Sequence, residues 1–146
     1  MFTVIKTSAL FIGLLLMVSA FSATADSLVV IAHPNSGISF FKRTELVNLY
    51  MGRTKKLPSG ITALPIDLPN NFIQKESFYR QLVNKPLPEI QAYWARLLFT
   101  GQATPPRQAD SMDEVLDLVS HNEGAIAYIN SSVVNPSVKI VFEFKP

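Results

Sequence analysis

The stretch SLVVIAHPNSGISFFKRTELVNLYMG, residues 27–52, holds in one run the strand–turn–helix order that decides the fold. Its first part is short, apolar and β-branched, and Pro34 ends it, which predicts a buried strand. The segment NSGIS, residues 35–39, is rich in turn-forming residues. Leu46, Leu49 and Tyr50 then recur at helical spacing, and Gly52 is placed to end the helix.

The same alternation continues along the rest of the chain. We predict further strands over 61–68, 125–129 and 138–144, and further helices over 74–85, 88–98 and 111–124. In the last strand, the alternation of Val138, Ile140 and Phe142 predicts one apolar face and one exposed face. Strands that alternate with helices for most of the length indicate an α/β fold.

The segment AYWARLLFTGQATPPRQ, residues 92–108, stops an aromatic-rich amphipathic helix abruptly. Gly101 fits a left-handed helix end, and the double proline at 105–106 forbids continuation. Three interpretations compete: a plain helix stop, the lip of a ligand cleft, or a surface for a partner. We favour the structural stop, because a glycine end followed by proline is common. Whether Thr100 also faces a ligand stays open.

Residues 1–25 have the pattern of a secretory signal peptide. Lys6 precedes an apolar run, and the run is followed by the small residues Ala23-Thr24-Ala25, an A-x-A cleavage site. An uncleaved membrane anchor is the alternative, but the apolar run is short for a span. We therefore expect cleavage before Asp26 and one exported domain over residues 26–146.

Composition excludes several kinds of function. The chain has a net charge of +2, and without Lys6 it keeps 12 basic and 11 acidic residues, so nothing favours nucleic acid as a partner. It has no cysteine, hence no disulfide. Because His33 and His121 are its only histidines, we expect neither a structural zinc site nor any other cofactor.

Catalysis has little support in the sequence. Ser111, His33 and Asp67 could form a hydrolytic set on paper, but no G-x-S-x-G motif is present. We therefore expect that the protein is not an enzyme. The acidic residues of 110–117 could suggest a metal site, but acids are ordinary at a helix start, where they offset the helix dipole.

Two other features have plain structural interpretations that we prefer. The basic turn containing Arg53, Lys55 and Lys56 could meet phosphate or an acidic partner, but three charges make a weak patch, and a solvated turn is the simpler interpretation. Trp94 could stack on a ligand, but its place on the apolar stripe favours the core.

Three loops lead directly into predicted helices: 35–39, 69–72 and 100–111. A helix N-terminus presents unpaired backbone N–H groups and partial positive charge, so each loop is a candidate anion site. Ser36 in the first loop and Thr100 at the start of the third are candidate ligand-binding residues. The signal is permissive, because ordinary helix capping requires the same residue types.

Six segments carry a family resemblance in their joint order: VVIAHP (29–34), TELVNLYMG (44–52), LPSGITALPIDLP (57–69), FYRQLV (78–83), AYWARLLFTGQATPP (92–106) and GAIAYI (124–129). Together they resemble the phosphate-type substrate-binding proteins of ABC transporters, the PstS-like periplasmic binding proteins. The resemblance implies a type 2 periplasmic-binding-protein fold, here one compact lobe with a mixed sheet flanked by helices. It also implies a periplasmic location and an ABC transporter permease as partner.

The chain departs from that family in two ways. Full-length members are more than twice as long, and two lobes close around the oxyanion. Their anion loop is of the Asp-Gly-Ser-Gly-Thr type and follows an arginine, whereas this chain has Asp67-Leu68-Pro69-Asn70-Asn71-Phe72, with Asp67 about where the arginine would be. An unscreened carboxylate there would repel phosphate. Only Asn70 and Asn71 carry over, as amide donors.

Two functional hypotheses follow. The first is periplasmic binding of phosphate or a similar oxyanion by helix N-termini. The second is a non-catalytic interaction module that kept the fold, lost ligand binding and docks to an envelope protein. In the second case exposed apolar surface would also favour a homodimer.

Overall fold

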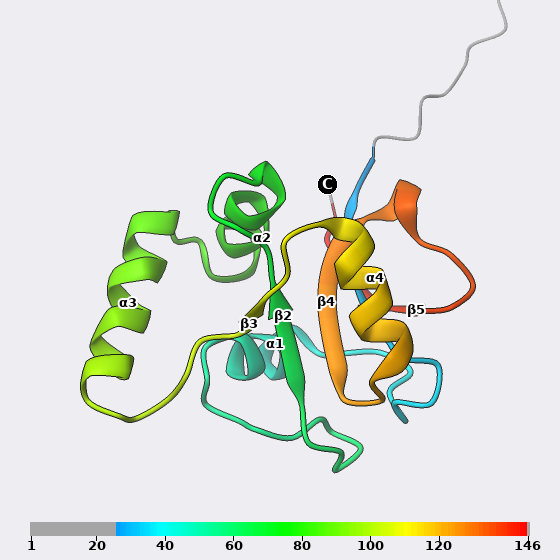
Figure 1. The fold of residues 1–146 in the computed structure, drawn as a ribbon, viewed down its shortest axis with the longest axis horizontal. Helices are drawn as coiled ribbons and strands as arrows, with labels where there is room; N and C mark the ends of the chain where they lie inside the picture. The colour runs from blue at the N-terminus through cyan, green and yellow to red at the C-terminus, as the bar shows by residue number, and fades with distance from the viewer. Residues whose placement is uncertain (1–25, 146) are drawn as a thin grey trace, which may run out of the picture.

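The structure, a computed structural model, describes residues 26–145; the signal peptide expected over 1–25 lies outside these residues. Figure 1 shows one sheet with helices around it. In chain order the elements are β1 (Leu28–Ala32), α1 (Arg43–Tyr50), β2 (Leu64–Asp67), α2 (Ile73–Val83), α3 (Leu87–Phe99), β3 (Arg107–Gln108), α4 (Met112–His121), β4 (Ala125–Asn130), a short 3-10 turn (Ser131–Val133) and β5 (Lys139–Glu143). The predicted α/β class is confirmed.

The sheet is mixed, as the resemblance implied. It has five strands in the order β3-β2-β4-β1-β5. β2 runs parallel to both β3 and β4, whereas β1 runs antiparallel to both β4 and β5. The short edge strand β3 was not predicted, because its two residues are exposed and carry no hydrophobic pattern.

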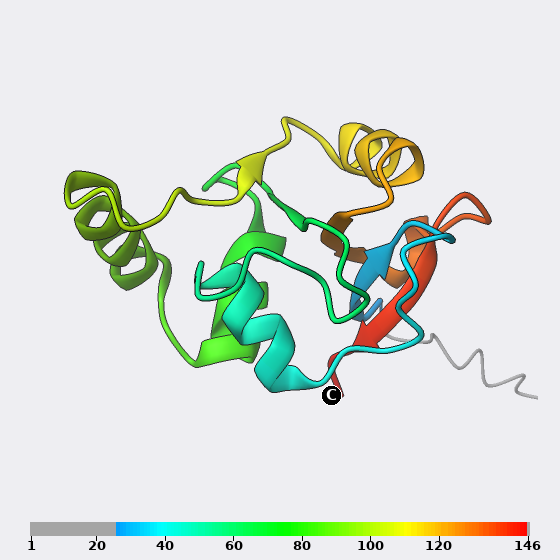
Figure 2. The same ribbon diagram turned by 90° about the horizontal axis from the view of Figure 1, so that it is seen from below.

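Helices cover both faces of this sheet. α4 lies on one face, α1 and α2 lie on the other, and α3 extends beyond the sheet beside α2 (Figures 1 and 2). The chain therefore leaves β2 toward one face and leaves the neighbouring β3 toward the opposite face. Adjacent parallel strands with such diverging connections form a topological switch point, where open α/β sheets bind ligands. Within residues 26–145, no helix combines the length and apolar character needed to cross a bilayer.

The core is built on β1 and a group of aromatic rings. All five residues of β1 are buried, as the sequence predicted. Behind the sheet, the rings of Phe78 and Tyr128 stack at a centroid distance of 4.0 Å, and Tyr50 meets Phe78 edge-on at 4.6 Å. These contacts join α1, α2 and β4, so the aromatic cluster fixes the helices of one face against the strands.

The burial pattern expected for the last strand is wrong. Val138, Val141 and Phe144 are buried, whereas Ile140 is 37% exposed. The cause is a shift in the pairing of β1 with β5, where Val30 faces Phe142 but the next residue of β1, Ile31, faces Ile140. A bulge of this kind leaves one residue unpaired, and Val141 turns inward as a result.

Helix α3 is held by two contacts with the end of α1. The Tyr93 hydroxyl donates a hydrogen bond of 2.6 Å to the carbonyl oxygen of Met51. A Cβ atom built on Gly52 would lie 2.7 Å from the ring of Trp94 and 3.3 Å from Ala103. The expected apolar stripe of α3 is therefore partly buried at Ile90 and Trp94, while Leu98 stays 51% exposed because α3 lies off the sheet.

Replacing Gly52 by alanine tests this close approach. Gly52 and Gly101 both have left-handed backbones, with φ of 73° and 67°, but nothing lies within 4 Å of a Cβ atom at Gly101. We expect G101A to cost about 1 kcal/mol, and G52A about 3 kcal/mol because Trp94 must also move. Urea unfolding of both variants measures the difference. Equal losses would contradict the close packing of Trp94 on Gly52.

Candidate functional site

A cavity of about 370 Å³ lies at the switch point, between α3 on one side and the ends of β2 and β3 on the other. We call it the switch-point cavity. Its polar lining residues are Asp67, Asn70, Lys75, Gln91 and Gln108, and its apolar ones are Ile90, Trp94, Ala95, Leu98, Pro105 and Pro106. A few polar groups over a largely apolar wall are typical of ligand sites.

Asp67, the last residue of β2, is the most constrained group at this cavity. It is 5% exposed. Its carboxylate accepts hydrogen bonds from the hydroxyls of Tyr79 (2.7 Å) and Tyr128 and from the backbone N–H of Leu68 (2.9 Å). The ammonium group of Lys75 lies 3.4 Å from the carboxylate.

Asp67 would repel phosphate as an unscreened carboxylate, and this network shows that it is screened. Lys75 compensates the charge of Asp67, so an anion entering the cavity meets a neutral pair. The pair is also well satisfied, since two hydroxyls and one N–H group serve the carboxylate oxygens. Buried ion pairs are stable only with such additional hydrogen bonds.

The two helices that begin at the switch point differ in how their first turns are capped. No side chain caps the start of α2, whose N-cap residue is Phe72. At α4, by contrast, the backbone N–H of Glu114 donates to the Ser111 hydroxyl (3.1 Å), and the N–H of Asp110 donates to the Glu114 carboxylate (2.7 Å). The predicted pairing of Ser111 with Glu114 is therefore present. An anion is better accommodated at α2, because Ser111 and Glu114 already accept from the N–H groups at the start of α4, whereas Glu76 in the first turn of α2 pairs with Arg80.

The structure brings only one of the four sequence-predicted site residues to the switch-point cavity. Asn70 lines it, whereas Asn71 is an exposed neighbour that does not. Thr100 is exposed, and its hydroxyl donates 3.0 Å back to the Arg96 carbonyl. It ends α3, so the structural interpretation of this residue accounts for its contacts.

Ser36 lies away from the other three. It follows β1, which runs antiparallel to β4, so its loop is at the opposite end of the sheet from the loop after β2. Ser36 is fully buried, and its hydroxyl accepts a 3.3 Å hydrogen bond from the N–H of Ile38. The three helix-start loops therefore do not converge on one site.

Sequence reasoning missed Lys75, Gln91 and Gln108. The position of Lys75 in the first turn of α2 was the only available signal, since Gln91 and Gln108 reach the cavity through α3 and the unpredicted β3. Trp94 is 7% exposed, as expected for a core residue, yet it also lines the cavity, and its indole N–H has no partner among residues 26–145.

Neither a catalytic triad nor a metal site is formed by the residues that sequence analysis considered. His33, like Ser36, follows β1 and so lies at the end of the sheet opposite Asp67. Within residues 26–145, no three histidine, aspartate or glutamate side chains gather closely enough to hold a metal ion.

Comparison of the fold with solved structures identifies phosphate-transport receptors as neighbours. An ABC-type phosphate transport receptor from Vibrio cholerae superposes with a TM-score of 0.64 at 16% identity, covering 80% of this chain and 45% of that chain. A putative phosphate ABC transporter substrate-binding protein with bound phosphate from Clostridium perfringens gives 0.63 at 19%, with coverages of 80% and 44%. PstS from Borrelia burgdorferi gives 0.61 at 17%, with 80% and 47%.

These likenesses concern the fold. No family model matches the sequence, and no curated protein is similar to it. The chain spans less than half the length of the three solved structures it resembles. Residues 26–145 thus have the fold of one lobe of a PstS-like substrate-binding protein.

Because of the buried tyrosines around Asp67, we predict that the free energy of unfolding falls at alkaline pH. Burial, and then the Asp67 carboxylate, raises the pKa of Tyr50, Tyr79 and Tyr128 well above 10. The stability that these raised pKa values contribute is fully present below about pH 10, the pKa of a tyrosine in the unfolded chain. It is lost as pH rises further, because only the unfolded chain then releases the hydroxyl protons. Each tyrosine contributes a loss approaching about 1.4 kcal/mol per pH unit.

Urea unfolding between pH 8 and 11 measures this slope. Y79F removes one of the three titrating hydroxyls, so the free energy of unfolding should fall with pH about one third less steeply. The loss of the hydrogen bond from Tyr79 to Asp67 also costs about 2 kcal/mol of stability at neutral pH. Comparing the two proteins cancels the lysines that titrate in the same range. Identical slopes would show that Tyr79 keeps its ordinary pKa in the folded state.

Proposed function

We propose that this protein is a periplasmic solute-binding protein, exported by cleavage of residues 1–25, that binds phosphate or a similar small oxyanion through residues 26–146. The observation that carries the proposal is a ligand-sized cavity at the switch point of a lobe whose solved neighbours are phosphate-transport receptors. An ABC transporter permease is the corresponding partner. The role is binding without catalysis.

The chemistry of the cavity supports an oxyanion at the start of α2. The N-terminal turn of a helix contributes backbone N–H donors and partial positive charge. Asn70 and Lys75 both line this cavity, and the side chains of both are donors. Because Lys75 is already shared with Asp67, we expect weaker binding than at an unpaired lysine.

Phosphate titration of the exported protein tests the proposal. Calorimetry at low and moderate salt measures affinity, and emission from Trp94, the one tryptophan of the chain, reports occupancy of the cavity it lines. We expect N70A to weaken binding about tenfold, since a hydrogen bond to an anion contributes about 1.4 kcal/mol. T100A is the matched control, because its hydroxyl bonds to its own helix. Absence of any heat or emission change with phosphate and sulfate would refute oxyanion binding.

A second candidate function is the non-catalytic interaction module. The observation that favours it is the end of α3, where Phe99 is 94% exposed and Leu98 is 51% exposed, beside the switch-point cavity. Apolar side chains gathered in this way mark surfaces that bind other proteins. An envelope protein or a second copy of this chain would cover them.

Sedimentation of F99S at high concentration tests the homodimer form of this candidate. If Phe99 is a contact, the unchanged protein self-associates and F99S shifts it toward the monomer. F40S is the control, since Phe40 is also exposed, at 67%, but belongs to the loop between β1 and α1. A protein that is monomeric at every concentration would argue against the homodimer.

A further inference from the structure

We infer that the protein has a second ligand site, for a small organic anion, beside the start of β2 and separated from the switch-point cavity by Pro105 and Pro106. This second site, which we call the basic cavity, has a volume of about 440 Å³. It lies between the loop 52–55, the start of β2 and the segment 103–107 that enters β3. Nothing in the proposed phosphate function uses it.

All the charged side chains that line the basic cavity are positive. Its only charged lining residues are Lys55 and Arg107, and no aspartate or glutamate lines it. Among residues 26–145, neither cation lies within ion-pair distance of a carboxylate. The switch-point cavity instead holds the neutral Lys75–Asp67 pair. The anionic group of an organic ligand that enters the basic cavity therefore meets net positive charge, within the Debye length of about 8 Å at physiological salt.

The remaining lining suits an anion with an organic body. The hydroxyl-bearing residues Thr54, Thr62 and Thr104 can donate hydrogen bonds to oxyanion oxygens. The floor and walls are apolar, formed by Leu49, Gly52, Ala63, Leu64, Pro65, Ala103, Pro105 and Pro106. A volume of 440 Å³ falls in the range of sites for small organic molecules, about 300–1,000 Å³, so a bare phosphate would leave much of it unfilled.

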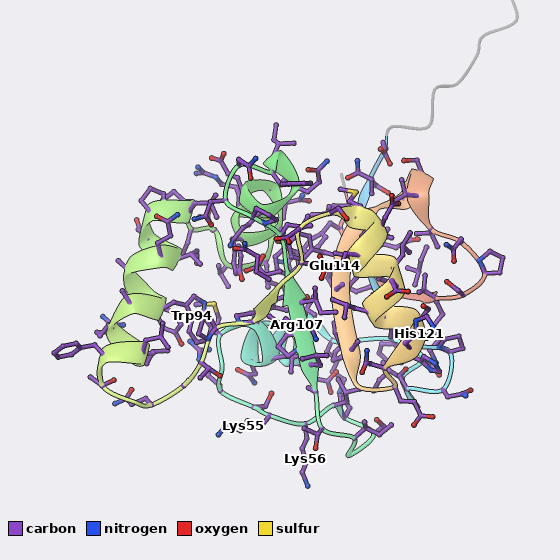
Figure 3. All side chains as sticks on the ribbon, viewed as in Figure 1. Lys55, Lys56, Trp94, Arg107, Glu114 and His121 are labelled. Carbon is purple, nitrogen blue, oxygen red and sulfur yellow. The ribbon has the colours of Figure 1, made fainter. Side chains whose placement is uncertain are left out.

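Backbone contacts hold the two cation-bearing segments in place. The carbonyl of Lys55 accepts a 3.0 Å hydrogen bond from Ala63, and the N–H of Thr54 donates to the carbonyl of Asn48 at 3.2 Å. Arg107 is paired with Ile66 in the sheet. Figure 3 shows Lys55 on the loop below β2 and Arg107 at β3. Segments fixed in this way lose little further entropy when a ligand binds.

Trp94 supplies a built-in reporter for this site. Its ring packs on Gly52, and the nearby Ala103 Cβ lies 3.3 Å from the position a Gly52 Cβ would take; both residues line the basic cavity. A ligand that fills this cavity therefore contacts the residues behind which the indole lies. Its emission, excited at a wavelength the ligand does not absorb, should change on binding. Because Trp94 also lines the switch-point cavity, the amide shifts of Thr54, Lys55 and Thr104 assign such a change to the basic cavity.

The test is a titration of the exported protein with phenyl phosphate, benzoate, benzyl alcohol and inorganic phosphate. We expect the two organic anions to change Trp94 emission and to shift the backbone amide resonances of Thr54, Lys55 and Thr104. The double variant K55Q/R107Q should weaken their binding at least tenfold. K56Q is the matched control, because Lys56 is the adjacent cation and lines a different cavity, so it should change affinity less than twofold.

Three results would overturn the inference. The first is that the organic anions at millimolar concentration shift none of these amide resonances. The second is that K55Q/R107Q binds the organic anions as tightly as the unchanged protein does, and the third is that neutral benzyl alcohol binds as tightly as the organic anions. The single variants K55Q and R107Q, both at exposed positions, keep the test valid if the double variant folds poorly. The outcome is separate from that of the proposed function, whose phosphate site depends on Asn70 and not on Lys55 or Arg107.

Discussion

The buried carboxylate of Asp67 is the constraint on which the arrangement of the lobe depends. It ends β2, and its hydrogen bonds reach Tyr79 on α2 and Tyr128 on β4, while Lys75 comes from the first turn of α2. A charge at 5% exposure is stable only while all of these partners stay in place. These contacts tie the end of β2 to α2 and β4 at the wall of the switch-point cavity.

The same carboxylate divides the molecule into two electrostatic environments. At the end of β2 where Asp67 lies, the positive charge of Lys75 is paired with Asp67, and the start of α4 is acidic. Lys55, beside the start of β2, and Arg107, which pairs with Ile66, remain available to solvent and ligands on the other side of the segment 105–106. The switch point of the sheet lies at the cavity that Asp67 lines, whereas the net positive charge lies at the basic cavity. The fold of the lobe therefore does not by itself determine which ligand it binds.

The sequence predicted the parts of the fold that rest on local patterns. The buried β1, the left-handed stops at Gly52 and Gly101, and the Ser111–Glu114 pairing all depend on neighbouring residues. The sequence did not predict features that depend on contacts between distant segments. Strand β3 forms only because residues 107–108 pair with β2, and the bulge opposite β1 changes which residues of β5 are buried. Asp67 was identified as unusual, but its partners Tyr79 and Tyr128 are 12 and 61 residues away, beyond any local pattern.

The double proline that ends α3 has a consequence for the two cavities together. Pro105 and Pro106 line both of them, so this short strip of chain is a partition with a ligand-sized space on each side. Proline fixes φ and stiffens the strip, so it moves as a unit and not residue by residue. The two cavities therefore share one wall, and a change in the position of this strip alters the shape of both spaces at once.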